Sequence, residues 1–169
     1  DIVEETAKRM GLPVSVISNK EENSNTAFFK RQYPLGMGMG SMQDEIFSIQ
    51  ENIIRDLAKK ESCIIVGRCG GYCLRNEKNL LKVYLYAPYE IRLKNCVERL
   101  GMTEKEAVKT ISAVDKARES YHKRYIPGYQ NATLDSDLCI NTGSYTVEQV
   151  AALIQDAAKN KFGFDVVQG

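Results

Sequence analysis

The stretch "SCIIVGRCGGYCLR", residues 62–75, combines a short apolar run with a glycine-arginine turn. Residues 63–66 are wholly apolar, as in a strand that is buried on both faces of a parallel sheet. Gly67 permits a tight turn, so Arg68 stands just beyond the carboxyl end of the predicted strand. Ligands of open α/β sheets bind at that edge, and a guanidinium is shaped to bind phosphate or carboxylate. Position alone does not decide between an anion ligand and an arginine that pairs with a structural carboxylate or faces water.

Helical and strand patterns alternate along the rest of the chain. Apolar residues at helical spacing predict a helix that Ser41 caps and that runs to about residue 57. The run "KVYLYAP", residues 82–88, predicts a second strand, and "LCINT", residues 138–142, predicts a third. Such alternation is typical of a parallel sheet with right-handed crossover connections.

Two capping boxes mark the starts of later helices. Thr103 with Glu106, and Thr146 with Gln149, have the spacing of an N-cap hydroxyl and its reciprocal partner. We expect the first box to open a long helix that ends near Tyr125, and the second to open the last helix. The other expected helices are residues 2–10 and about 89–100.

Length and composition limit the class of protein. The 169 residues are 43% hydrophobic and 27% charged, which is enough for one domain over residues 1–169 with its own core. A net charge of +1 argues against a nucleic-acid partner, and no apolar run reaches the roughly 20 residues that would make the protein a membrane protein. The five cysteines match no zinc pattern, so we expect no metal site in the protein and a reducing, cytoplasmic location.

Residues 18–41 have the composition of a mobile loop or insertion. They are polar, then aromatic, and end in "GMGMGS", residues 36–41. A phosphate loop needs a preceding strand and a Lys-Ser or Lys-Thr pair at its end, whereas Pro34 precedes these glycines and no lysine stands beside Gly40. A flexible hinge is the favoured interpretation.

The expected helix that ends near Tyr125 carries a group of charged and aromatic residues. Asp115, Arg118 and His122 lie at i, i+3 and i+7 and share one face. Such a group, on a segment that leads into a loop, suits a lid that closes over anionic phosphates and excludes water. Spacing alone favours a solvated helix face with ordinary ion pairs. The neighbouring members of the group are Lys116, Tyr121, Lys123 and Arg124.

Two further arginines share a face of the helix expected at residues 89–100. Arg92 and Arg99 lie at i and i+7, so Arg99 is a candidate for the same anion as the lid. Alternatively, both are surface residues whose aliphatic stems cover the core. Because His122 is the only histidine, the sequence offers no Ser-His-Asp triad or histidine-ligated metal site that does not use it.

Four segments together resemble the cytidylate-kinase-like family of P-loop nucleoside monophosphate kinases. They are "SCIIVGRCGGYCLR", "LLKVYLYAPYEIRLKNCVERLGMTEKEA", "DKARESYHKRY" and "SDLCINTGSYTVEQV", and the resemblance covers about residues 42–160 in unbroken order. It implies a three-layer α/β P-loop NTPase fold, in which a central parallel sheet has helices on both faces. It also implies an acceptor-side insertion near residues 18–41 and a lid near residues 115–135.

The resemblance implies transfer of the ATP γ-phosphoryl group to a nucleoside monophosphate, CMP first among them, with Mg²⁺. Catalysis of this kind depends mainly on positioning and on stabilisation of charge, so arginines matter more than any nucleophile. Asp115 would orient a lid arginine. By similarity, the acceptor would be bound by Gly67, Arg68 and Cys69, catalysis would use Arg118, Arg124 and Asp115, and Arg92 and Arg99 would lie on the ATP side.

Two features leave alternatives open. Typical cytidylate kinases have Asp after the Gly-Arg pair, where this chain has Cys69, so a different monophosphate or another small hydroxylated metabolite is an alternative acceptor. The P-loop G-x-x-x-x-G-K-[ST] is absent from these residues, and we expect it in a segment upstream of Asp1. A degraded P-loop there would indicate a nucleotide-binding regulator without catalysis. The sequence does not decide the oligomeric state, so a homodimer that uses residues 18–41 also stays open.

Overall fold

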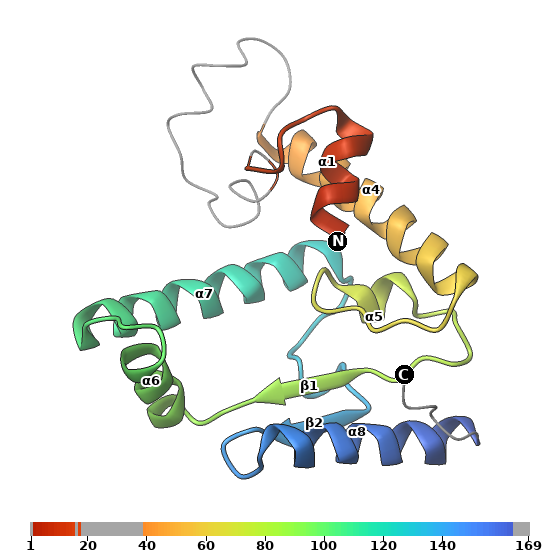
Figure 1. Ribbon diagram of the computed structural model, residues 1–169. Coiled ribbons are helices and arrows are strands. Elements are labelled where there is room, and N and C mark those ends of the chain that lie inside the picture. The colour runs from red at the N-terminus through yellow and green to blue at the C-terminus, as the bar shows by residue number, and fades with distance from the viewer. Residues whose placement is uncertain (1, 16, 18–38, 164–169) are drawn as a thin grey trace. The chain divides into compact units, whose positions relative to one another are not determined.

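The computed structural model describes residues 2–15, 17 and 39–163, and the chain forms two compact units, Asp1–Asn76 and Glu77–Gly169. The insertion expected at residues 18–41 lies outside the described residues up to residue 38. In chain order, the helices and strands are α1 (Ile2–Met10), α4 (Met39–Lys60), α5 (Gly70–Cys73), β1 (Val83–Tyr86), α6 (Tyr89–Glu98), α7 (Glu104–Tyr125), β2 (Leu138–Asn141) and α8 (Val147–Phe162) (Figure 1).

The first unit is built on the packing of α1 against α4. The core between them contains buried Ala7, Ile17 and Ile46, with partly buried apolar residues around it. Acidic residues in the first turn of α1 and basic residues in its last turn complement the helix dipole. An ion pair of 3.5 Å between the Arg9 guanidinium and the Asp56 carboxylate also joins the two helices. The predicted helix at residues 2–10 is therefore confirmed.

Two details of this unit differ from the sequence-based expectations. The helix α4 begins at Met39, before the expected cap at Ser41, and continues to Lys60. The strand predicted at residues 62–66 is absent, because in the described part of the chain these residues pair with no strand. Ile64 is 92% exposed and Val66 is 85% exposed. An apolar run becomes a strand only where a neighbouring strand accepts and donates its backbone hydrogen bonds.

The second unit contains a parallel pair of strands with helices after each strand. The strands β1 and β2 pair in parallel from Val83 opposite Leu138 to Tyr86 opposite Asn141, so both lie where the sequence predicted strands of a parallel sheet (Figure 1). The helix α6 follows β1 after Pro88 and packs against α7. The described residues therefore form an α/β fold with a small parallel sheet and many helices.

Both predicted capping boxes are confirmed in this unit. The Thr103 hydroxyl accepts a hydrogen bond from the backbone N–H of Glu106, and the Glu106 carboxylate accepts one from the backbone N–H of Thr103. Thr146 and Gln149 exchange the same two bonds at the start of α8. These caps satisfy backbone donors that the first turn of a helix would otherwise leave unpaired.

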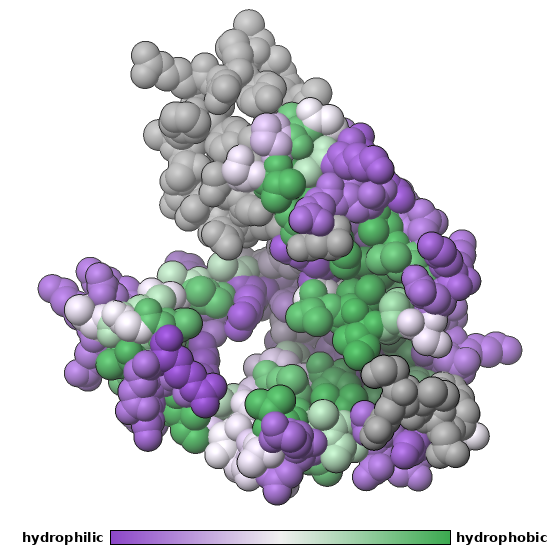
Figure 2. Space-filling view, in the orientation of Figure 1, coloured by the Kyte–Doolittle hydropathy of each residue, from purple (hydrophilic) through white to green (hydrophobic). Residues whose placement is uncertain are grey.

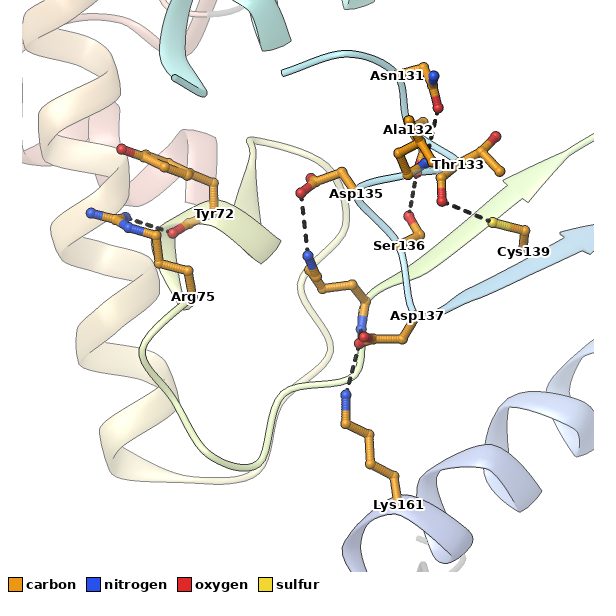
Figure 3. Close-up of polar contacts among 12 residues, drawn as sticks. Tyr72, Arg75, Asn131, Ala132, Thr133, Asp135, Ser136, Asp137, Cys139 and Lys161 are labelled. Atoms are coloured by element: carbon orange, nitrogen blue, oxygen red, sulfur yellow. Dashed lines mark hydrogen bonds and ion pairs between the residues drawn. The ribbon is translucent and has the colours of Figure 1, made fainter. Parts of the chain in front are cut away.

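A carboxylate fixes the start of the two-stranded sheet. The Asp137 carboxylate accepts hydrogen bonds from the backbone N–H of Lys82, at 2.8 Å, and from the Lys161 ammonium of α8, at 2.9 Å (Figure 3). The backbone bond, followed by the contact with Lys161, holds the pKa of Asp137 below its ordinary value. Asp137 thereby joins β1, β2 and α8 at the amino-terminal ends of the two strands.

The lowered pKa of Asp137 gives a pH-dependent stability. Since the pKa of the folded state lies below that of the unfolded chain, near 4, the stabilisation is present above about pH 4 and is lost as the pH falls through the folded value. We expect Asp137→Asn to lower the free energy of unfolding at pH 7 by less than about 1 kcal/mol, because solvent screens this partly exposed group, and by less at pH 3. Urea denaturation at both pH values measures the difference. Asp156→Asn, an exposed substitution on α8, is the control, and an equal loss at both pH values for Asp137→Asn would contradict the assignment.

Candidate functional site

The turn between residues 66 and 70 has an unusual backbone conformation. Gly67, Arg68 and Cys69 have φ angles of 74°, 55° and 52°, and the latter two are the non-glycine residues with positive φ in the described part of the chain. Side chains make this left-handed region unfavourable by about 1–2 kcal/mol per residue. Such strain persists only where surrounding contacts enforce it, and it concentrates at functional sites. The turn thus singles out Arg68, the residue that the sequence analysis names as a candidate anion ligand.

Buried contacts hold the turn on its inner side. Cys69 is 5% exposed and Cys73 is 2% exposed, and α5, which ends at Cys73, packs against α4. The backbone N–H of Gly70 donates to the carbonyl of Gly67, and that of Cys73 donates to the carbonyl of Cys69, each at 2.9 Å. The structure therefore buries the Cys69 side chain in the core, so its thiol is not exposed to a ligand.

Gly70 is required by a close approach within the same unit. A Cβ atom at this position would lie 2.7 Å from Cγ2 of Ile65, which is closer than side chains tolerate. Glycine therefore allows the first residue of α5 to lie against the segment that precedes the turn. The helix α5 and this close fit were not foreseen from the sequence, although cysteines at i and i+4 in "CGGYC" were a signal of one buried helical face.

The Cys73 thiol contacts the backbone of Arg68. Its Sγ atom lies 3.8 Å from the Arg68 carbonyl oxygen, to which the S–H donates. Burial, followed by the negative charge of Glu51, raises the pKa of the Cys73 thiol to about 11. The thiol is therefore protonated at neutral pH and remains a hydrogen-bond donor.

Arg68 lies at the edge of a groove within the first unit. The groove has a volume of about 730 Å³ and is formed by α1, α4 and the segment 63–66. In the space-filling view, hydrophobic side chains reach the surface in the area of α5 (Figure 2). The apolar lining residues are Ile2, Val3, Ile53, Leu57, Ile64, Ile65 and Val66, and the charged ones are Glu5, Arg9, Asp56, Lys60 and Arg68. Arg68 is a half-buried member of this lining.

An ion pair in the second unit joins two of the predicted site residues. The Arg92 guanidinium on α6 donates to the Asp115 carboxylate on α7, with an Nη2–Oδ1 distance of 2.6 Å. This hydrogen bond raises the pKa of Arg92. The resemblance assigned Asp115 to a lid arginine, whereas the structure pairs it with Arg92, which was expected on the ATP side. The pair therefore links the α6 arginine to the helix that carries the predicted lid.

Ring contacts fasten the end of α7 to the residues that follow it. The His122 ring stacks on Tyr129 with a centroid distance of 5.1 Å, and its Nδ1 lies 2.8 Å from the Arg118 carbonyl oxygen. Arg118 and Arg124 are exposed on this half of the helix, and Arg124 lies over the Tyr125 ring at 5.6 Å. Exposed guanidiniums on a helix that is joined to its loop are suited to bind anionic oxygens.

The last predicted site residue to be placed is Arg99. Arg99 is an exposed residue at the C-cap of α6, where its backbone N–H donates to the carbonyl of Asn95. Within the described ranges, no three His, Cys, Asp or Glu side chains are grouped as metal ligands. None of the helices described has both the length and the apolar sequence needed to span a bilayer.

Comparison with known proteins identifies the family of this chain. The model of the cytidylate kinase-like family matches residues 1–144, which include the strained turn, the α6–α7 pair and β2. The chain belongs to the cytidylate kinase-like family. The resemblance that the four sequence segments indicated is therefore confirmed.

Individual relatives of this cytidylate kinase-like chain are distant. A cytidylate kinase from Archaeoglobus fulgidus is 28% identical over 122 residues, which are 69% of this chain and 64% of that protein. A cytidylate kinase from Sulfolobus acidocaldarius is 28% identical over 130 residues, which are 73% of this chain and 69% of that protein. The chain thus spans less than two thirds of the first relative's length. A crystal structure of an uncharacterized protein from Eubacterium ventriosum has a TM-score of 0.65 at 23% identity, covers 94% of this chain and 89% of its own, and supports the fold.

The burial of Cys73 predicts a low reactivity for its thiol. Raising the pKa from 9.0 to about 11 lowers the thiolate fraction at pH 8 by about 100-fold, and burial adds to this protection. We expect iodoacetamide to modify Cys73 at least about 100-fold more slowly than exposed Cys63 and Cys139, as measured by peptide mass spectrometry over time. Comparable rates at Cys73 and Cys139 would show that the inner side of the turn is open.

Proposed function

We propose that this protein is a P-loop nucleotide kinase that transfers the γ-phosphoryl group of ATP to a nucleoside monophosphate, with CMP as the first candidate acceptor. The match of the cytidylate kinase-like family to residues 1–144 carries the proposal, and the strained presentation of Arg68 supports it. The proposal includes a three-layer α/β arrangement in the whole protein, of which the described parallel pair of strands is one part.

Arg68 is the proposed ligand of the acceptor's phosphate. Its guanidinium has donors in a planar fork that matches two phosphate oxygens. Because Gly67, Arg68 and Cys69 share a left-handed backbone conformation, the direction in which the Arg68 side chain leaves the backbone is set before the acceptor arrives. Preorganised donors of this kind lower the cost of binding and hold the attacking oxygen in place.

The arginines of α6 and α7 are the proposed ligands of ATP. Arg118 and Arg124 would hold phosphate oxygens of both ATP and the acceptor, and Arg92 and Arg99 would lie on the ATP side. These residues supply cationic N–H donors, which fits a triphosphate. Mg²⁺ usually binds through phosphates, waters and one or two carboxylates, so its proposed place is on the triphosphate. When bound, ATP and Mg²⁺ supply the phosphoryl group and a bridging cation. The role of Asp115 is to fix Arg92 by the ion pair of 2.6 Å.

A second candidate is a kinase with another acceptor, either a different monophosphate or a small hydroxylated metabolite. The observation that favours it is the burial of Cys69, which stands where typical cytidylate kinases have Asp and directs no polar side chain toward a base. A screen of acceptors for ADP formation distinguishes the two. A regulator of the same family would bind nucleotide without turnover.

The intact protein should convert ATP and CMP, with Mg²⁺, to ADP and CDP. A coupled assay of ADP formation measures this, with UMP, AMP, GMP and dCMP as parallel acceptors. Chelation of Mg²⁺ should abolish turnover, because the cation neutralises charge on the transferred group. Nucleotide binding without turnover of any acceptor would favour the regulator and reject the kinase.

Substitutions should separate acceptor binding from turnover. We expect Arg68→Ala to raise the KM for the acceptor by about 10–100-fold, because it removes a charged hydrogen bond made in the ground state. Arg118→Ala should instead lower kcat by about 10²–10³-fold, because charge develops on the transferred group in the transition state. Steady-state kinetics against each substrate provide both values, with Lys109→Ala, an exposed lysine in the first half of α7, as the control. Small and equal effects of the two arginine variants would contradict these roles.

A further inference from the structure

The Cys73 thiol is buried and contacts the backbone carbonyl of Arg68, so it can affect the position of Arg68 without touching a ligand itself. We propose that Cys73 is a positioning residue: its thiol, together with the close seat of Gly70 on Ile65, holds the left-handed turn that presents Arg68 to an acceptor phosphate. This inference rests on the proposed function, because it assigns a role to the surroundings of the same arginine. It concerns only contacts within the first unit.

The contacts of Cys73 bracket the two strained residues. Its backbone N–H donates to the carbonyl of Cys69 at 2.9 Å, and its S–H donates to the carbonyl of Arg68, with Sγ at 3.8 Å. The carbonyls of both left-handed residues are thus held by one buried residue. Without these bonds, the turn would tend to relax to negative φ angles, which L-residues prefer. Such a change would rotate the Arg68 side chain away from its present direction.

The helix α5, which follows the turn, is also held against α4 by the contacts of Arg75. The Arg75 guanidinium stacks on the Tyr72 ring at 3.9 Å and donates to the Tyr72 carbonyl at 2.7 Å (Figure 3). It also lies 3.9 Å from the Glu51 carboxylate of α4, which pairs with Arg55 at 2.7 Å. These surface contacts hold the outer side of α5, while Cys69 and Cys73 hold the inner side. The turn that contains Arg68 is therefore held from both sides of the helix that follows it.

Burial of the Cys73 thiol and binding at Arg68 should be linked. A reagent reaches Cys73 only when the turn opens, and a phosphate that binds Arg68 favours the closed turn by mass action. CMP is the probe. At ten times its Kd, we expect CMP to slow alkylation of Cys73 in the wild-type protein about tenfold and to leave the exposed Cys139 unchanged. An unchanged rate at Cys73, while calorimetry shows CMP bound, would overturn the inference.

A double-mutant cycle separates positioning from general stability. Cys73→Ala should raise the Kd for CMP about fivefold, as expected for a lost hydrogen bond, and Cys73→Ser, which keeps a donor, should stay within about twofold of wild type. The double variant Arg68→Ala/Cys73→Ala should bind CMP no more weakly than Arg68→Ala alone, because Cys73 acts through Arg68. Cys139→Ala is the matched control, since its thiol makes a similar contact, at 3.9 Å, with the carbonyl of Thr133 in the other unit.

The outcomes of the cycle are distinct. If the losses from Arg68→Ala and Cys73→Ala simply add, Cys73 serves stability only and the inference is rejected. If Arg68→Ala weakens CMP binding and Cys73→Ala does not, the inference fails while the proposed function stands. If the wild type binds no CMP, the proposed CMP kinase and this inference both fail. Should Cys73→Ala not fold, Cys73→Ser and the alkylation of the wild-type protein decide.

Discussion

A backbone that is buried or in a sheet must find partners for its N–H and C=O groups, and this constraint organises the second unit of the protein. In the second unit, β1 and β2 meet it by pairing with each other from Val83 to Tyr86. The ladder is closed at its far end by Thr142, whose N–H and hydroxyl both donate to the Tyr86 carbonyl, at 2.7 and 3.0 Å. Because the strands are parallel, this closure brings the loop after β2 next to the start of α6, where a Cβ on Gly143 would meet Ile91. The sheet thereby fixes the helix that carries Arg92.

Local signals in the sequence predicted most of this unit. Capping boxes and strand composition depend on residues close together in the chain, so Thr103, Thr146 and the two strands were found at nearly the correct positions. The prediction at residues 62–66 was wrong for a physical reason. Composition shows that Ile64 and Val66 favour burial, but it cannot show which segment would cover them, and among the described residues no strand does.

The candidate site was predicted by residue type but not by conformation. Arg68 was singled out because an arginine after an apolar run and a glycine has the chemistry of an anion ligand. The left-handed conformation of Arg68 and Cys69 has no local signal, because neither residue favours positive φ. It arises from packing between α4 and α5 and from the absence of a side chain at Gly70, which are properties of the folded unit. For the same reason, the contact between the Cys73 thiol and the Arg68 backbone could not be predicted from the residues alone.

The structure holds Arg68 in the first unit more firmly than it holds Arg118 on the second half of α7. Arg68 follows a glycine, is half-buried, and belongs to a turn that buried thiols and a close glycine contact restrain. The buried residues of α7, Ala107 and Ile111, both lie in its first half, so the half that carries Arg118 is held by the Arg92–Asp115 pair and by ring contacts. Elements with few buried apolar contacts open at lower free energy than the core. A phosphoryl transfer enzyme needs both properties, since its acceptor must be held in line while a lid closes over the phosphates and opens again in each cycle. The difference in restraint therefore supports the proposal that Arg68 binds the acceptor and that α7 carries the lid.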